Sequence, residues 1–69
     1  NKMNTIKYTD RNGLVSYPSD LQGLSYNDCL TQLNLFEQDE FEMYESDRQT
    51  EDYLVLNHTD GTFESYEIN

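Results

Sequence analysis

The sequence predicts a single small α+β domain in which one helix packs on an antiparallel sheet. Three observations lead to this prediction. Five short segments alternate polar with apolar side chains or are rich in β-branched and aromatic residues, as strands are. One segment near the middle of the chain has the apolar spacing of a helix. Turn-forming residues separate these segments, and the expected order is ββαβββ.

The first two strands are predicted to form a hairpin. MNTIKYT, residues 3–9, alternates, and DRNG then supplies a turn in which Asn12 or Gly13 takes a positive φ. The second strand is expected over residues 13–17. Pro18 ends it, because proline has no N–H to donate to the next strand.

A helix is predicted over residues 25–35, after a connection over residues 19–24. Ser25 and Asp28 have the spacing of a capping box, in which each side chain accepts a hydrogen bond from a backbone N–H at the helix start. Five apolar or aromatic residues follow at spacings of three and four: Tyr26, Cys29, Leu30, Leu33 and Phe36. This stripe is expected to face the sheet.

Three strands are expected after the helix. EFEMYES, residues 40–46, alternates, and DRQTED is expected to be a polar link over residues 47–52. YLVLNH, residues 53–58, has apolar residues on both faces and is therefore expected to be a central strand. Asp60 and Gly61 give a two-residue hairpin signal, and FESYEIN is the returning strand.

Length and composition limit what such a domain can be. A chain of 69 residues with one cysteine fits one domain with a small core and no internal disulfide. Met3 is expected to be the initiator, which makes residues 1–2 a tag remnant and residues 3–69 the domain. No apolar stretch has the length of a signal sequence or a membrane span, so the expected compartment is the cytoplasm, without membrane contact.

The excess of negative charge is confined to one half of the chain. The formal net charge is −10. Residues 1–36 contain three acidic and three basic residues, whereas residues 37–69 contain eleven acidic residues against Arg48 alone. The whole excess therefore falls after the predicted helix, on the later strands and their links.

Several function classes are disfavoured by these residues. The chain is too short for a deep cleft around a carboxylate pair, so the protein is not expected to be an enzyme. His58 and Cys29 are too few for a zinc site or a Cys-His nucleophile pair, and both are expected to be structural. Asp47, Glu51 and Asp52 could hold a cation weakly, but no calcium-loop motif is present, so no metal or other cofactor is expected. Four basic residues are too few for direct nucleic-acid binding.

The acidic residues fit a surface that imitates DNA. Acids at alternate positions of neighbouring strands form a lattice, with about 6.8 Å between side chains along one face and about 4.8 Å between strands. DNA carries about one charge per 1.7 Å of its axis. A protein with a basic DNA-binding groove would then bind this domain instead of DNA, and salt would weaken the complex. The predicted partner-binding residues are Glu37, Asp39, Glu40, Glu42, Tyr44, Glu45, Asp47, Glu51, Asp52, Asp60, Glu64 and Glu67.

In size, charge and element order the chain resembles the small acidic inhibitors that bacterial viruses encode as DNA mimics against host proteins. About two thirds of it is similar in outline to phage uracil-DNA glycosylase inhibitors, through Gly23-Leu24-Ser25 before the helix, Asp28 within it and DEFEMYESD after it. The last hairpin, residues 53–69, has no counterpart in those inhibitors. The resemblance implies a protein that inhibits by occupying a DNA-binding site in the host cytoplasm.

Phage inhibitors of the nucleoid protein HU and anti-CRISPR mimics share this size and acidity. HU is the favoured target, because its broad basic saddle suits a dispersed charge lattice and the sequence contains no device for filling one enzyme's active site. From another class, the chain could be a small assembly subunit whose acidic face only prevents aggregation, or an acidic module tuned by a metal. A homodimer is compatible with both the mimic and the assembly subunit.

Overall fold

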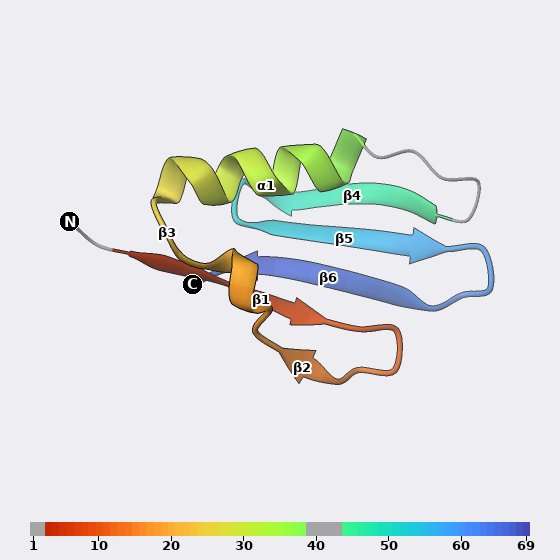
Figure 1. Ribbon diagram of the computed structural model, residues 1–69. Coiled ribbons are helices and arrows are strands. Elements are labelled where there is room, and N and C mark those ends of the chain that lie inside the picture. Colours follow the sequence, from red (N-terminus) through yellow and green to blue (C-terminus); the bar gives the residue numbers. More distant parts are fainter. Residues whose placement is uncertain (1–2, 39–43) are drawn as a thin grey trace.

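The computed structural model describes residues 3–38 and 44–69 and confirms the α+β fold. One helix packs on an antiparallel sheet of six strands (Figure 1). The elements are β1 Asn4–Thr9, β2 Val15–Ser16, the 3-10 helix η1 Ser19–Leu21, β3 Gln22–Leu24, α1 Tyr26–Gln38, β4 Tyr44–Thr50, β5 Tyr53–His58 and β6 Phe63–Ile68.

The strands run in the order β2-β1-β6-β5-β4, and β3 also pairs with β1. All pairings are antiparallel. β5 pairs on both sides, with β4 and β6, so the prediction of an interior strand is confirmed. Among the described strands, β4 forms one outer edge of the sheet, and β2 and β3, which pair with the two ends of β1, form the other. The hairpin turns after β1 and β5 contain Gly13 and Gly61 with positive φ, which supports the two turn predictions.

Residues 19–24, expected to be a connection, instead contain η1 and β3. β3 pairs with the start of β1, and the side-chain amide of Gln22 donates to the backbone oxygens of Ile6 at 3.2 Å and Pro18 at 2.9 Å. The observed order therefore has a third strand before the helix. The sequence did not predict it because three residues are too few to establish an alternating pattern.

The predicted link over residues 47–52 is wrong over residues 47–50 and holds only for Glu51 and Asp52, which form the β4–β5 turn. Asp47 and Arg48 pair with Val55 and Leu54, so β4 continues to Thr50. The sequence predicts that the strand ends at residue 46, where the apolar residues stop, but an edge strand is held by pairing with its neighbour and can be polar. Residues 40–43 of the predicted strand lie outside the described residues.

The start of the helix follows the sequence prediction. The Ser25 hydroxyl accepts a hydrogen bond from the backbone N–H of Asp28 at 3.1 Å, so Ser25 is the N-cap and the helix begins at Tyr26. The helix extends to Gln38, one turn beyond the predicted end at residue 35. The second strand is shorter than predicted, with Val15–Ser16 in place of residues 13–17.

The hydrophobic core lies between α1 and one face of the sheet. Its buried residues are Ile6, Leu21, Cys29, Leu33, Leu54, Leu56 and Ile68, and Leu24, Leu30, Phe36 and Tyr66 pack around them. The predicted helix stripe is thus confirmed at four of its five positions. The exception is Tyr26 in the first turn, which is exposed. Cys29 fills the core, as expected for a structural cysteine.

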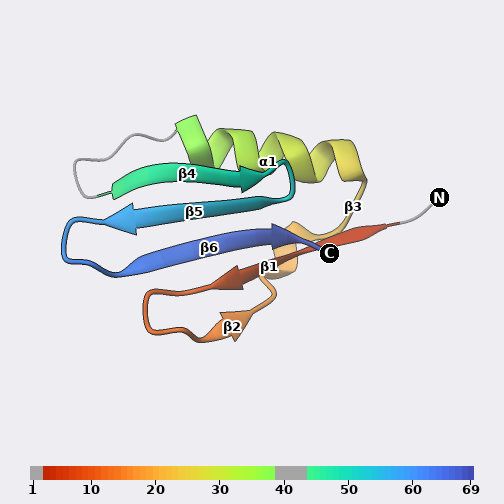
Figure 2. The same ribbon diagram turned by 180° about the vertical axis from the view of Figure 1, so that it is seen from behind.

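Strand register assigns each side chain to one face of the sheet, because directly paired residues lie on the same side. Leu54, a core residue, pairs with Tyr66, which packs against the core, so both lie on the face that α1 covers. Val55 pairs with Ser65 and with Asp47, and these residues lie on the opposite face. Figure 2 shows this opposite face, which α1 does not cover. We call it the open face.

Candidate acidic interface

β4 brings two of the predicted partner-binding acids to the open face. Glu45 pairs with Asn57 and Asp47 with Val55, so both carboxylates point away from α1. Both are exposed, and being two residues apart on one strand they lie about 6.8 Å from each other. The amide of Gln49 donates to Asp47 Oδ2 at 2.5 Å. β4 therefore has negative side chains on its open face at the edge of the sheet.

Arg48, the single basic residue after position 36, points to the other side of β4. Its Nη1 donates to Glu37 Oε2 at 2.6 Å and to Asn34 Oδ1 at 3.1 Å, both on α1. Its Nη2 and Nε donate to the backbone oxygen of Glu51 at 2.8 and 3.2 Å. Arg48 thus joins the helix, the edge strand and the β4–β5 turn. It neutralises Glu37 and leaves the two carboxylates of β4 outside this contact.

The β4–β5 turn supplies two further predicted acids. Glu51 is exposed at the turn. Asp52 is half-buried, and its carboxylate accepts a hydrogen bond from the hydroxyl of Tyr26. This hydrogen bond, with partial burial and the charge of Asp52, raises the pKa of Tyr26 to about 12. Tyr26 is exposed because it reaches toward this turn and not into the core.

Asp60 lies in the β5–β6 turn, at the opposite end of the strands from the β4–β5 turn, and is paired with a cation. Arg11 from the β1–β2 turn places Nη2 2.5 Å from Asp60 Oδ2 and donates through Nε to Thr62 Oγ1 at 2.8 Å. Thr62 also donates its hydroxyl and its N–H to Asp60 Oδ1. These two bonds from Thr62, followed by the charge of Arg11, lower the pKa of Asp60 to about 2.

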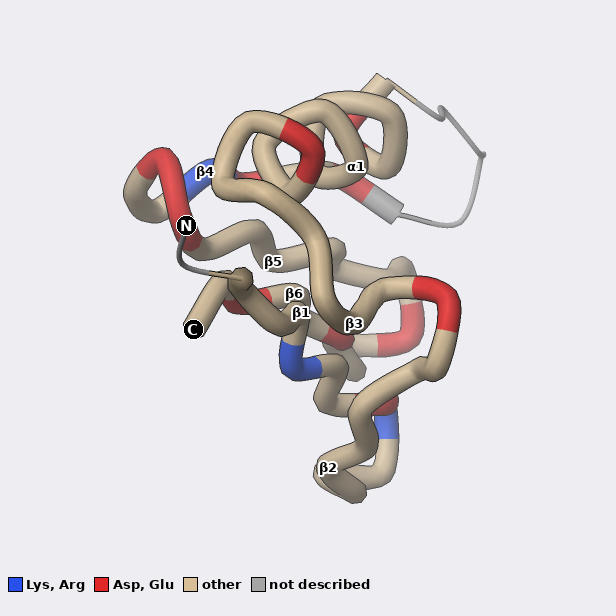
Figure 3. Tube along the Cα trace, turned by 60° about the vertical axis from the view of Figure 1, so that its left-hand side comes forward, with Lys and Arg blue, Asp and Glu red and all other residues tan. Residues whose placement is uncertain are grey.

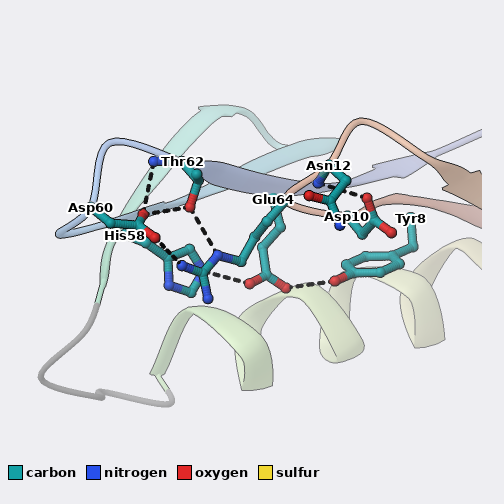
Figure 4. A network of polar contacts seen from close by, with 8 residues as sticks. Tyr8, Asp10, Asn12, His58, Asp60, Thr62 and Glu64 are labelled. Atoms are coloured by element: carbon teal, nitrogen blue, oxygen red, sulfur yellow. Dashed lines mark hydrogen bonds and ion pairs between the residues drawn. The ribbon is translucent and has the colours of Figure 1, made fainter.

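Glu64 lies on the α1 side of the sheet and not on the open face (Figure 4). Its Oε1 accepts a hydrogen bond from the hydroxyl of Tyr8 at 2.9 Å, and its Oε2 lies 2.5 Å from His58 Nε2. Both the Glu64 and the His58 side chains are largely buried. Burial, with the hydrogen bond to Glu64, raises the pKa of Tyr8 above its usual range. His58 is thus placed at the end of β5 in a structural contact, as expected.

Glu67 is on the open face, but a cation faces it across the neighbouring strand. Lys7 of β1 pairs directly with Glu67 of β6, and Lys7 Nζ lies 3.7 Å from Glu67 Oε1. Exposed pairs of this kind contribute little to stability. They do reduce the local negative charge on this part of the sheet.

The predicted acids therefore fall into two groups. Glu45, Asp47 and Glu51 come together at the β4 edge, with Asp52 beside them. The other predicted acids that the structure describes each face a cation or histidine, and these pairs are Glu37 with Arg48, Asp60 with Arg11, Glu64 with His58 and Glu67 with Lys7. Figure 3 shows the basic positions on β4, on β1 and on the turn after β1. Tyr44 is in β4 opposite His58. Asp39, Glu40 and Glu42 lie outside the described residues.

The sequence reasoning did not find the inward contacts of Arg48 and Glu64. For Glu64 a signal was present: counting back in twos from Ile68, a core residue, places positions 66 and 64 on the same face. The segment carries aromatic residues on both faces, at Phe63 and Tyr66, so the pattern alone did not choose between them. For Arg48 no signal existed, because its partners lie 11 and 14 positions earlier on the helix.

Within residues 3–38 and 44–69, no three of the His, Cys, Asp and Glu side chains are grouped closely enough to hold a metal ion. The described helix is not of the length and hydropathy needed to cross a membrane. A comparison with known proteins found no matching family model, no similar curated protein and no similar solved structure.

Proposed function

We propose that the protein is a non-enzymatic inhibitor that occupies the DNA-binding surface of a basic host protein through the acidic edge formed by β4 and the β4–β5 turn. The acidic edge is defined by Glu45, Asp47, Glu51 and Asp52. The observation that carries the proposal is the direction of the charges. Arg48 points inward while Glu45 and Asp47 point outward, so the edge keeps its negative charge.

The ion pairs elsewhere strengthen this polarity. Lys7, Arg11 and Arg48 each face a carboxylate of their own chain, so the described cations reduce negative charge away from the acidic edge or beneath it. A positively charged groove would be attracted over a distance set by the Debye length, about 8 Å at physiological salt. The contact itself would replace phosphates with carboxylates, and salt would weaken it as it weakens DNA binding.

A nucleoid protein such as HU is the first target to test. Its DNA-binding surface is broad and nonspecific, and the acidic edge presents dispersed charges without a side chain shaped for a pocket. Uracil-DNA glycosylase and CRISPR effectors are alternative targets, and the inhibitor would bind any of these targets in the cytoplasm. The protein itself would not bind nucleic acid, because it has only four basic residues and those in the described part of the chain already face carboxylates.

Competition with DNA tests the proposal. Labelled duplex DNA is bound to HU, and separately to a uracil-DNA glycosylase, at low salt, and its displacement by the protein is followed by fluorescence anisotropy. The double variant Glu45→Gln with Asp47→Asn should displace DNA at least about tenfold less well than the unmodified chain, because two charge-assisted contacts are lost. Displacement should also weaken steeply as salt rises.

The matched control is Asp20→Asn with Asp28→Asn. These acids are exposed on η1 and on the first turn of α1, and their removal changes the net charge by the same amount. The control should compete within about twofold of the unmodified chain, since long-range charge alone changes mainly the association rate. If both double variants lost competition equally, or if the unmodified chain displaced DNA from no basic protein, the proposed function would be rejected.

An assembly subunit is a second candidate, favoured by the exposed apolar residues near β2. Leu14, Val15 and Tyr17 are all more than half exposed. In that case the acidic edge would serve only solubility. Salt separates the two candidates, because a contact between apolar surfaces does not weaken as ionic strength rises, whereas a contact between the acidic edge and a basic groove does.

A further inference from the structure

The outer edge of β4 carries backbone groups that pair with no other described strand. β4 is the last strand in the order of the sheet, and among the described strands it pairs with β5 alone (Figure 2). In an antiparallel ladder, alternate residues direct their N–H and C=O groups toward one neighbouring strand, and the residues between them direct theirs to the other side. Every second residue of β4 therefore directs its backbone groups away from the sheet.

The hydrogen bonds on the far side of β5 establish which residues these are. The N–H of His58 donates to the backbone oxygen of Thr62 at 2.8 Å, and the N–H of Ile68 donates to that of Asp52 at 2.9 Å. His58 and Asp52 stand at the two ends of β5, and both direct backbone groups toward β6. By alternation, all even-numbered residues of β5 face β6 and the odd-numbered residues face β4.

The same alternation continues into β4. The odd-numbered Val55 and Asn57 pair with Asp47 and Glu45, so the backbone groups of these two acidic residues are directed toward β5. The residues between and beside them direct their N–H and C=O groups outward. These outward groups belong to Tyr44, Ser46 and Arg48.

The side chains along this edge restrict which strand could be added to it. Glu45 and Asp47 are exposed on the open face, and the small side chain of Ser46 is exposed between them on the other face. If an added strand formed a hydrogen-bonded pair at Ser46, both acids would lie in non-hydrogen-bonded pairs, in which opposite side chains are closest. Two side chains of the added strand, about 6.8 Å apart, would then lie directly opposite the two carboxylates.

Charge determines the occupant of this edge. A second copy paired through its own β4 would bring Glu45 and Asp47 of the two chains opposite one another, and like charges in that position destabilise a sheet. Arg48 does not neutralise them, since its Nη1 lies 2.6 Å from Glu37 on the α1 side. The amide of Gln49, which donates to Asp47 Oδ2 at 2.5 Å, is neutral. The edge therefore excludes its own copy and fits a basic strand.

We propose that a basic protein binds this chain by adding an antiparallel strand to the outer edge of β4, with Lys or Arg at two alternate positions of that strand opposite Glu45 and Asp47. The antiparallel direction is that of all described pairs of the sheet. The inference rests on the proposed function for the kind of partner, and it adds how that partner is held. Backbone hydrogen bonds hold the added strand, and the two carboxylates select a basic one.

A disulfide-closed hairpin peptide tests this edge without any host protein. One strand of the peptide alternates lysine with threonine, and closure reduces the entropic cost of ordering that strand. At low salt and saturating peptide, hydrogen exchange followed by NMR should slow at least about tenfold at the N–H groups of Ser46 and Arg48. A hairpin of the same composition with its lysines grouped near the turn should bind at least about fivefold more weakly. Equal binding of the two peptides, or no slowing of exchange, would overturn the proposal.

Ser46→Pro tests the backbone contact while every charge is kept. It removes an outward N–H, and proline is tolerated on an edge strand where the N–H faces solvent. This variant should bind the alternating hairpin at least about tenfold more weakly than the unmodified chain. Circular dichroism checks that the variant is folded, and the exchange measurement on the unmodified chain decides the question if it is not. A folded Ser46→Pro chain that binds as tightly as the unmodified chain would contradict strand addition.

Val15→Pro is the matched control on the other edge of the sheet. The N–H of Asp10 donates to the backbone oxygen of Leu14 at 2.9 Å, so Leu14 faces β1 and the N–H of Val15, one position later, points away from it. Val15→Pro therefore also removes an outward N–H from an edge strand, and it should bind the hairpin within about twofold of the unmodified chain. An equal loss in both proline variants would remove β4 as the site.

The DNA-displacement assay separates this inference from the proposed function. If the unmodified chain and a folded Ser46→Pro chain displace DNA equally well, the proposed function stands and strand addition is rejected. If the chain displaces DNA from no basic protein but the alternating hairpin protects Ser46 and Arg48, the proposed function is rejected and the strand-binding edge stands. Loss of displacement in Ser46→Pro and not in Val15→Pro would support both.

Discussion

Individual polar contacts decide where this protein keeps its charge. Arg48 turns under β4 to meet Glu37, and Glu64 turns under the sheet to meet Tyr8 and His58. The distribution of charge along the sequence assigns Glu37 and Glu64 to one acidic surface. The directions of the side chains separate these two acids from that surface. The pattern of burial at single residues therefore defines the acidic edge more sharply than the net charge of the chain does.

The first prediction concerns the titration of Asp60. Its pKa of about 2 is held down mainly by the two hydrogen bonds from Thr62 and then by Arg11. Because the folded pKa is below the unfolded value of about 3.9, the stabilisation from this group is present above pH about 4 and is lost as pH falls toward 2. We expect a carboxyl-detected NMR titration to give this low pKa.

Substitution separates the two causes. Thr62→Val removes the hydroxyl donor and should raise the pKa of Asp60 more than Arg11→Gln does, since the hydroxyl bond is the largest cause. Lys7→Gln, which removes a cation paired with Glu67, is the control and should leave the pKa of Asp60 unchanged. A larger effect from Arg11→Gln would mean that charge, and not the Asx-type hydrogen bonds, holds this carboxylate ionised.

At the scale of elements, the edge strand β4 depends on its neighbours for its conformation. Its sequence, YESDRQT, has no apolar alternation and would not form a strand alone. It is held along one edge by its ladder with β5, and on the face toward α1 by the contact of Arg48 with the helix. The register shift between Arg48 and Thr50 lets the chain turn into β5 directly after this contact.

The second prediction follows from this contact. Arg48→Met keeps the aliphatic stem but removes every donor to Glu37, Asn34 and Glu51, and should lower the free energy of unfolding by about 1 to 2 kcal/mol. Gln49→Met, the next residue on the same strand, is exposed and should change it by less than about 0.5 kcal/mol. Urea unfolding followed by circular dichroism measures both, and equal losses would contradict the assigned role.

Local patterns predicted what depends on neighbouring residues in the chain. The N-cap at Ser25, the buried stripe of the helix and the turn at Gly61 all follow from spacings within a few positions. The strand β3 and the continuation of β4 to Thr50 could not be predicted, because their pairing partners β1 and β5 stabilise them and their own residues do not. The same limit applies to the candidate site, because the contacts that turn Arg48 and Glu64 toward the α1 side are made with residues distant in the sequence.

At the scale of the whole molecule, the charge changes from one end of the strand order to the other, whereas the core lies on one face of the sheet. Two exposed apolar residues, Val15 and Tyr17, lie at the β2 end of the sheet, and the acidic edge at β4 carries outward carboxylates. The core covers only the α1 side of the sheet. A small core and strong self-repulsion make the stability of such a chain sensitive to ionic strength.

The third prediction is that salt stabilises the fold. Between about 10 mM and about 1 M salt the Debye length falls from about 30 Å to about 3 Å, so repulsion among the acidic residues is screened. We expect the melting temperature to rise by several degrees over this range at a fixed low protein concentration. Glu45→Gln with Asp47→Asn should raise the melting temperature at low salt and reduce its dependence on salt. A melting temperature that falls as salt increases would contradict this account of the charge.

The pairing of β1 with β6 has a kinetic consequence. Ile6 lies opposite Ile68, 62 positions further along the chain, and Thr5 and Asn69 exchange backbone hydrogen bonds at 3.2 and 2.8 Å. Closing so long a loop carries an entropic cost that must be met before any contact of this ladder forms. β1 is then made early in synthesis yet cannot join its neighbour until β6 has followed. We therefore expect the meeting of these two strands, and not the formation of α1, to limit the rate at which the domain folds.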